Sequence, residues 1–260
     1  MFEKEFHQVA KKAVKYVAKH ILKEGATSVK PKGEYDYSTD KDIASENYII
    51  EAIKKSFPND NILSEEGNCE NSLKDRTWII DPIDGTVNYM KGLPLCCIQL
   101  AFYSEGKAQF SIIYIHSEKQ LFFAINGKGA YLNGQRLQLE KNNIKATLAE
   151  VCIARFYDAV SITCDVIKAI NNDVLAFRSF GSYGYSLAKF AKGGFGVFFF
   201  ISHKINLWDC LPGELICKEA GAYSIRKTYK NYDYHTISID EEYANKVAKT
   251  IEEKIDGYKD

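Results

Sequence analysis

The most informative stretch of the chain is Trp78-Ile-Ile-Asp81-Pro-Ile-Asp84-Gly-Thr86-Val-Asn88. An apolar strand runs into one aspartate, and a second aspartate follows after a proline and an isoleucine. Pro82 cannot continue a β-ladder and bends the chain, so Asp81 and Asp84 are expected to converge instead of pointing to opposite faces of a sheet. The carbonyl of Ile83 becomes available between them. Asp84 or Gly85 can then begin a helix whose free amides bind an anion.

Oxygen ligands of this kind suit hard cations such as Mg²⁺. Two carboxylates beside a phosphate-sized pocket repel the phosphate unless a metal neutralises them, and with metal they become a scaffold for hydrolysis. The alternative is an ordinary turn after a strand, in which one aspartate only caps a helix. The stretch alone leaves both interpretations open.

Two further acidic segments bear on that choice. A short apolar strand, residues 62–64, ends in the adjacent glutamates Glu65 and Glu66. Farther along, Leu207-Trp-Asp209-Cys-Leu-Pro212-Gly places Asp209 where a helix N-cap is expected, with Pro212 in the first turn. Taken separately, the glutamates fit a solvated turn and Asp209 fits a cap.

Hydrophobic periodicity predicts the surrounding elements. A helix is expected over residues 2–23, a mobile lysine-bearing loop over 25–38, and a second helix from Thr39-Asp40 with Asp42 in a capping box. Alternation with a period of two and turn residues then predict an antiparallel meander over 97–140. Later segments predict helices near 158–171, 184–192, 210–220 and 240–253, with buried strands at 197–201 and 222–225. This is an α/β chain of layered sheets covered by helices, with halves at 1–145 and 146–260.

The composition limits the possible partners. Thirty-four basic residues balance 34 acidic ones, so the formal net charge is zero and a strongly basic nucleic-acid binder is excluded. Seven cysteines without metal-ligand spacing indicate reduced thiols. The N-terminal sequence lacks a secretory pattern, and the apolar run 195–201 is too short to span a bilayer. We therefore expect a cytoplasmic protein with no membrane and no nucleic-acid partner.

The joint occurrence of these segments resembles the inositol monophosphatase family. Asp81-Pro-Ile-Asp-Gly-Thr86, preceded by Trp78-Ile-Ile, is similar to the family's first signature, and residues 207–221 resemble its second. Order and spacing agree from about residue 5 to 225. The resemblance implies an αβαβα sandwich of the inositol monophosphatase/fructose-1,6-bisphosphatase type. It also implies a Mg²⁺-dependent, lithium-sensitive phosphomonoesterase that forms a homodimer.

The resemblance further implies roles for individual residues. Roughly two to three Mg²⁺ ions are expected per site, held by Glu66, Asp81, the Ile83 carbonyl, Asp84 and Asp209. Thr86, with Glu66, orients the attacking water, and Asp40 matches the aspartate that hydrogen-bonds this threonine. The substrate is expected to contact Asp84, Gly85, Thr86, Gly181, Ser182 and Asp209. Lys30 and Lys32 either reach over the site or belong to a plain solvated loop.

The substrate stays open at this stage. Inositol-specific members carry a glutamate seven residues before the aspartate of the second signature, and this position is Ser202, followed by His203 and Lys204. This favours a substrate with a second anionic group over inositol phosphate, although His203 also fits a plain surface histidine. The candidates are an inositol-1-phosphate-like ester, fructose 1,6-bisphosphate and a 3′(2′),5′-bisphosphate nucleotide. A non-catalytic regulatory protein with a specific partner is the alternative from another class.

Overall fold

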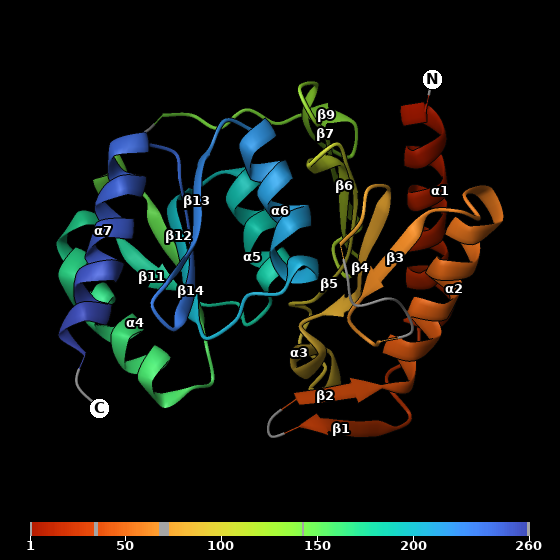
Figure 1. Cartoon of the computed structure of the whole chain (residues 1–260), viewed down its shortest axis with the longest axis horizontal. Helices are drawn as coiled ribbons and strands as arrows, with labels where there is room; N and C mark the ends of the chain where they lie inside the picture. The colour runs from red at the N-terminus through yellow and green to blue at the C-terminus, as the bar shows by residue number, and fades with distance from the viewer. Residues whose placement is uncertain (1, 34–35, 68–72, 142, 259–260) are drawn as a thin grey trace.

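The computed structural model describes residues 2–33, 36–67, 73–141 and 143–258. It has five layers, in which helices and sheets alternate (Figure 1). Two outer helix layers enclose two sheets, and a pair of central helices lies between the sheets. The expected αβαβα sandwich is therefore confirmed. Among the described residues, no helix is both long enough and apolar enough to cross a membrane.

The larger sheet belongs to the N-terminal half and has the strand order β3-β4-β5-β6-β7-β8-β9. Its first pair is parallel, and all later pairs are antiparallel, as the predicted meander requires. The strands are β3 (Asn61–Ser64), β4 (Thr77–Asp84), β5 (Cys97–Ser104), β6 (Lys107–Ile115), β7 (Gln120–Ile125), β8 (Gly129–Leu132) and β9 (Gln135–Arg136). Because β3 and β4 are parallel, the segments that follow them leave the sheet at the same edge.

The smaller sheet belongs to the C-terminal half and has the order β11-β10-β12-β14-β13. Three neighbouring strands, β11, β10 and β12, run parallel, and β12 pairs antiparallel with β14. The strands are β10 (Leu148–Ile153), β11 (Ala176–Arg178), β12 (Phe195–Ser202), β13 (Tyr223–Tyr229) and β14 (Tyr232–Ser238). The apolar run 195–201 is the predicted buried central strand.

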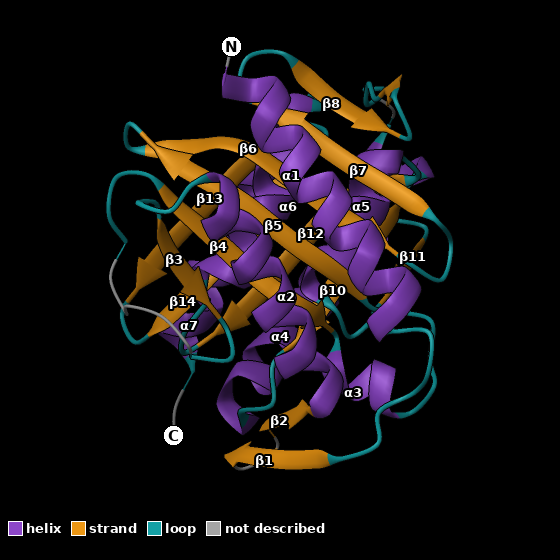
Figure 2. Ribbon diagram, turned by 90° about the vertical axis from the view of Figure 1, so that its right-hand side faces the viewer, coloured by secondary structure: helices purple, strands orange, loops and turns teal. Residues whose placement is uncertain are grey.

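Helices fill the remaining three layers. The larger sheet is covered by α1 (Phe2–Tyr16), which continues into the π-helix η1 (Val17–Ile21), and by α2 (Asp40–Ser56) (Figure 2). The smaller sheet is covered by α4 (Tyr157–Ile170) and α7 (Glu241–Gly257). The central pair is α5 (Tyr183–Lys192) and α6 (Leu207–Glu219). Short helices are α3 (Thr86–Met90), η2 (Ile144–Ala146) and η3 (Asn171–Asp173). The proposed division into two domains near residue 145 stays a prediction.

The predicted loop over 25–38 is wrong for most of its length. Two short antiparallel strands form there, β1 (Val29–Gly33) and β2 (Asp36–Thr39). They lie beyond the edge of the layers, beside α3 (Figures 1 and 2). β1 is exposed throughout, so it lacks the buried alternation from which a strand is predicted. Cys69 and the residues joining β1 to β2 lie outside the described residues.

The two central helices pack closely at Gly213 of α6. A methyl group at this position would lie 2.6 Å from Cβ and 2.5 Å from Cδ1 of Leu187 in α5. Alanine favours a helix over glycine by about 1 kcal/mol, but overpacking a core costs roughly 1–3 kcal/mol. Because Leu187 is fully buried and cannot swing away, the steric cost dominates.

Contacts this short place the steric cost in the upper part of its range, so we expect Gly213→Ala to lower the free energy of unfolding by about 1–2 kcal/mol. Chemical denaturation with a fluorescence readout measures this change. Gly257→Ala, at the end of α7 where nothing lies within 4 Å of the added methyl group, is the matched control and should not destabilise the protein. An unfolding midpoint of Gly213→Ala at or above that of the unmodified protein would contradict the close packing.

Candidate metal centre and active site

The end of β4 brings the two aspartates of the opening stretch together. The ladder between β4 and β5 shifts register between Asp81 and Asp84, where Pro82 interrupts it. The turn is closed by the Ile83 amide, which donates to Asp81 Oδ1 at 3.1 Å. Gly85 follows with φ of 87°, and an added methyl group there would lie 2.9 Å from the Leu95 carbonyl oxygen. The predicted bend and the helix start after it are both present.

Asp209 of α6 completes a cluster of three carboxylates with Asp81 and Asp84. One oxygen from each lies within 4.8 Å of the other two. Burial raises the pKa of Asp81 well above its usual value, and the charges of Glu65, Asp84 and Asp209 raise it further. Burial, and then the charges of Glu65 and Asp84, likewise raise the pKa of Asp209. Such a cluster of hard oxygen donors is destabilised by its own charge and fits a divalent cation such as Mg²⁺.

Asp209 reaches the cluster from inside a helix, not from its cap. The predicted N-cap role is wrong, because α6 begins at Leu207 with Asn206 as its N-cap. Asp209 therefore lies in the first turn, and Pro212 lies within the helix. The only side chain found to donate to the Asp209 carboxylate among the described residues is Asn206, with Nδ2 3.3 Å from Oδ2. The Asn206 backbone donates to the same carboxylate, so a single neighbouring residue supplies these hydrogen bonds.

Asp84, in contrast, is held by the N-terminus of α5. Its Oδ2 accepts from Ser182 Oγ at 2.6 Å and from the Gly184 amide at 2.6 Å, and its Oδ1 accepts from the Tyr183 amide at 3.1 Å. Burial still outweighs these hydrogen bonds and raises the pKa of Asp84. Gly181 and Ser182, predicted to touch the substrate, thus lie at the site. Ser182 also orients a carboxylate.

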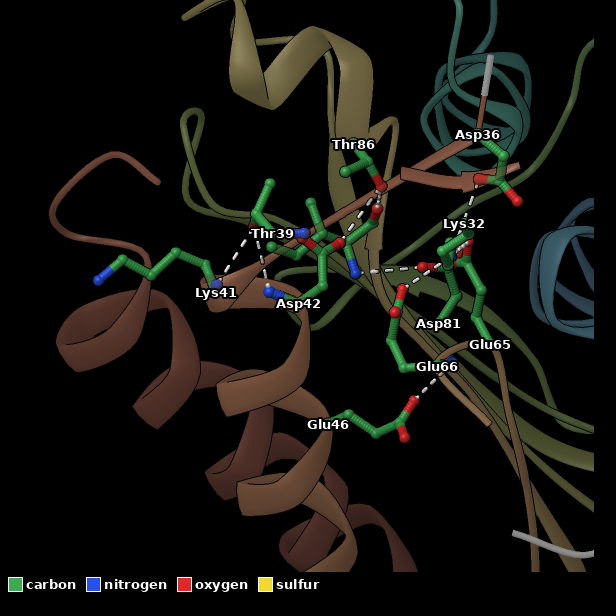
Figure 3. Close-up of polar contacts among 11 residues, drawn as sticks. Lys32, Asp36, Thr39, Lys41, Asp42, Glu46, Glu65, Glu66, Asp81 and Thr86 are labelled. Carbon is green, nitrogen blue, oxygen red and sulfur yellow. Dashed lines mark hydrogen bonds and ion pairs between the residues drawn. The ribbon is translucent and has the colours of Figure 1, made fainter. Parts of the chain in front are cut away.

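Glu65, and not Glu66, is the glutamate that faces the aspartate cluster. Glu65 shares a side-chain hydrogen bond with Asp81 and lines the cavity. Lys32 of β1 places Nζ 2.9 Å from both Glu65 Oε1 and Glu66 Oε1 (Figure 3). Burial raises the pKa of Glu65 to about 7 although the charge of Lys32 lowers it. The Glu66 carboxylate instead pairs with Lys32, and the Glu66 amide donates to Glu46 Oε2 at 2.9 Å. The geometry therefore favours Glu65 as the glutamate ligand.

Asp42, and not Asp40, is the acidic partner of Thr86. Thr86 Oγ1 lies 3.2 Å from Asp42 Oδ1 and 3.0 Å from the Ile83 carbonyl (Figure 3). Asp40 accepts instead from the amide of Thr27 at 2.8 Å and from that of Ser28 at 3.0 Å. These hydrogen bonds outweigh burial and lower the pKa of Asp40 to about 2. The prediction for Asp40 is thus wrong, because its side chain is held by Thr27 and Ser28, just before β1, and not by Thr86.

Asp42 combines this contact with a structural role. It forms the predicted capping box of α2, in which its Oδ2 accepts from the Thr39 amide at 2.8 Å. The side chain is fully buried, and this burial raises its pKa in spite of the hydrogen bonds from Thr39. The Ile83 carbonyl accepts from Thr86 and retains a second lone pair for another contact. Asp42 therefore links the start of α2 to the reactive end of β4.

Glu65, Thr86 and the three clustered aspartates line a cavity of about 760 Å³, to which residues of both halves of the chain contribute. Asp36 and Tyr37 of β2 line the cavity, together with the carboxylates of the larger sheet. Further lining residues lie at the ends of β10 and β12 and in the loops that follow β10, β11 and β12. Lys204 lines it, whereas Ser202 is buried and His203 lies elsewhere, with Nε2 3.0 Å from Asp158 Oδ2. His203 is therefore a surface histidine outside the cavity. Sequence reasoning missed Arg155, Cys152 and Tyr37, because no motif marks them.

The carboxylate pKa values predict how pH and Mg²⁺ together affect stability. Glu65 has a pKa of about 7 in the folded protein against 4.5 in a free side chain, so between these values the folded state holds a proton that the unfolded chain has lost. This contribution stabilises the metal-free protein at low pH and is lost as the pH rises through that range. Mg²⁺ requires the deprotonated form, so its stabilising effect grows over the same range.

We expect the increase in Tm on replacing EDTA by Mg²⁺ to be clearly larger at about pH 7.5 than at about pH 5.5. Each kcal/mol corresponds to roughly 2–4 °C for a chain of this size. Buried His235, whose pKa burial lowers to about 4, contributes equally with and without Mg²⁺. The difference therefore isolates the carboxylates, and differential scanning fluorimetry measures it. A Mg²⁺ effect independent of pH would contradict a metal bound by Glu65 and its neighbours.

Comparison with known proteins places the chain among related sequences. The model of the inositol monophosphatase family matches residues 2–256. A Thermotoga maritima protein named fructose-1,6-bisphosphatase/inositol-1-monophosphatase is 35% identical over 192 residues, which cover 74% of this chain and 72% of that protein. The Escherichia coli K12 protein named Nus factor SuhB is 34% identical over 219 residues, which cover 82% of this chain and 80% of that protein. A solved Thermotoga maritima IMPase superposes with a TM-score of 0.82 at 27% identity and covers 99% of both chains.

Proposed function

The chain belongs to the inositol monophosphatase family, and on that premise we propose that it is a Mg²⁺-dependent hydrolase of small phosphate monoesters. The observation that carries the proposal is the cluster of the buried Asp81 and Asp84 with the partly buried Asp209, in which one oxygen from each lies within 4.8 Å of the other two at a cavity. We assign Glu65, Asp81, the Ile83 carbonyl, Asp84 and Asp209 as ligands. Bound Mg²⁺ would supply charge neutralisation for the phosphate and activation of water.

The remaining chemistry falls to the protein's own groups. Thr86 Oγ1 donates to only one oxygen at a time, so a proton shared with Asp42 leaves it free to accept from a water in the cavity. Asp42, buried and held by the capping box, keeps the hydroxyl in a fixed direction. The amides of Gly85 and Thr86 are proposed to contact phosphate oxygens. Direct attack of water forms a new P–O bond while the P–O bond to the alcohol breaks, and the alcohol leaves with a proton that comes from the water, so no covalent intermediate on a side chain is required.

Phosphate release is the direct test of this function. The purified protein is incubated with inositol 1-phosphate, fructose 1,6-bisphosphate and 3′-phosphoadenosine 5′-phosphate, each with Mg²⁺ and with EDTA. Release with Mg²⁺ that disappears with EDTA supports the proposal, and inhibition by millimolar lithium supports the assignment within the family. Absence of release from every ester would refute it.

A regulatory role is the second candidate, and the relative named Nus factor SuhB is the observation that favours it. The two roles separate experimentally, because a binding role survives substitution of Asp209 whereas hydrolysis does not. A macromolecule that binds stoichiometrically to both the unmodified protein and Asp209→Asn would support the regulatory role. Assembly into a homodimer and a cytoplasmic location also remain proposals.

A further inference from the structure

Two basic residues line the same cavity as the carboxylates, and the topology of the smaller sheet brings them there. β10 and β12 are adjacent parallel strands, with Ile153 in register with Ile201. The carboxyl ends of both strands therefore lie at the same end of the sheet, and neighbouring strands are separated by about 4.8 Å. Arg155 follows β10 and Lys204 follows β12, and both line the cavity. The two cations therefore lie in neighbouring loops over one edge.

Neither of these two side chains is held in a direct contact with a carboxylate of the described residues. Among the described residues, Arg155 and Lys204 are the only basic residues that line the cavity, and neither forms an ion pair. Two further acids near these loops, Asp158 beyond β10 and Asp233, which pairs with Ser202 across the sheet, have other partners. Asp158 pairs with His203 and accepts a hydrogen bond from the Tyr232 hydroxyl at 2.7 Å. Asp233 accepts from the Ile205 amide at 3.0 Å.

The end of β12 adds no competing carboxylate. It finishes at Ser202, a buried hydroxyl that does not line the cavity. An acid at this place would partly cancel the charge of Lys204, two residues away. The five acids that do line the cavity, Asp36, Glu65, Asp81, Asp84 and Asp209, come from β2, from the ends of β3 and β4, and from α6. Arg155 and Lys204 instead follow strands β10 and β12 of the smaller sheet.

We propose that Arg155 and Lys204 form a subsite for a second anionic group, so that the preferred substrate is a small metabolite with two phosphates. The proposal rests on the phosphatase function proposed above and specifies its substrate class. One phosphate lies at the carboxylate cluster, where it is cleaved, and the other is bound by the guanidinium and ammonium groups. A cavity of about 760 Å³ is large enough for a small metabolite.

Matched substrate pairs test this subsite. Values of kcat/KM are measured with Mg²⁺ for fructose 1,6-bisphosphate against fructose 1-phosphate, and for 3′-phosphoadenosine 5′-phosphate against adenosine 3′-monophosphate. We expect the unmodified protein to prefer the bisphosphate in at least one pair by about tenfold or more. The pair that shows the preference identifies a sugar or a nucleotide as the carrier.

The double variant Arg155→Gln/Lys204→Gln should lower that bisphosphate-to-monophosphate ratio by at least about tenfold, mainly through KM. Arg178→Gln/Lys168→Gln removes the same charges outside the cavity and should keep the ratio within about twofold. A wild-type ratio near one in both pairs, or a ratio that the first double variant does not change, overturns the subsite but not the phosphatase. Absence of any phosphate release overturns both proposals.

Discussion

Replacing Asp209 by asparagine is expected to lower Mg²⁺-dependent phosphate release by about a thousandfold, the scale of losing several kcal/mol of charge stabilisation at a metal site. Asp209 belongs to the three-carboxylate cluster, and its carboxylate accepts from Asn206, so its negative charge is available to the proposed cation. Asparagine keeps the shape but removes the charge. The measurement is kcat/KM for the best ester found, with Mg²⁺ varied to saturation.

A stability measurement separates this effect from misfolding. Removing one charge from a cluster of mutually repelling carboxylates should leave the Tm of the metal-free protein unchanged or raise it. Glu150→Gln is the matched control, because Glu150 is a buried carboxylate whose pKa is also raised but which does not line the cavity. Full activity of Asp209→Asn, or a loss in Glu150→Gln as large as in Asp209→Asn, would contradict the metal assignment.

The second large effect is expected at Asp42. Asp42→Asn should reduce kcat by about a hundredfold or more, the lower end of what a positioned proton acceptor contributes. Its carboxylate lies 3.2 Å from Thr86 Oγ1, and an amide oxygen accepts a proton far less readily. Asp40→Asn should change kcat by no more than about twofold, because Asp40 contacts Thr27 and Ser28 instead. Steady-state kinetics on the same ester compare the two variants.

Thr86 provides the control for this prediction, because Asp42 also caps α2. Thr86→Ser keeps the hydroxyl and should retain most of the activity, whereas Thr86→Val should lose as much as Asp42→Asn. Neither change at Thr86 touches the capping box between Thr39 and Asp42. If Asp42→Asn lost activity only in proportion to its loss of folded protein, measured by circular dichroism, the carboxylate would have a purely structural role.

Much of this architecture could be predicted because its signals are local. Pro82 must interrupt a ladder, and the structure has a register shift between Asp81 and Asp84. Thr39 and Asp42 have the spacing of a capping box and form one. Alternation also predicted the meander, since each of its strands has a buried face.

The choice between neighbouring acids could not be predicted, because it depends on tertiary contacts. Asp40 and Asp42 lie two residues apart, and only the packing of the hairpin against Asp40 decides which of them reaches Thr86. Glu65 and Glu66 are adjacent, and their directions follow from how the chain leaves β3 beside Glu46. Arg155 carries no local signal, because its place in the cavity follows from the parallel pairing of β10 with β12.

The origin of the ligands has a consequence for how the chain folds during synthesis. Asp81 lies on β4, its partner Asp209 lies on α6, and Asp84 is held in place by the amides of Tyr183 and Gly184. A nascent chain that has emerged only as far as residue 180 thus lacks Asp209. It also lacks the amides that hold Asp84 in place. The proposed Mg²⁺ site is complete only after both sheets have assembled around α5 and α6. A cation bound there would therefore stabilise the completed protein and not its partly folded precursors.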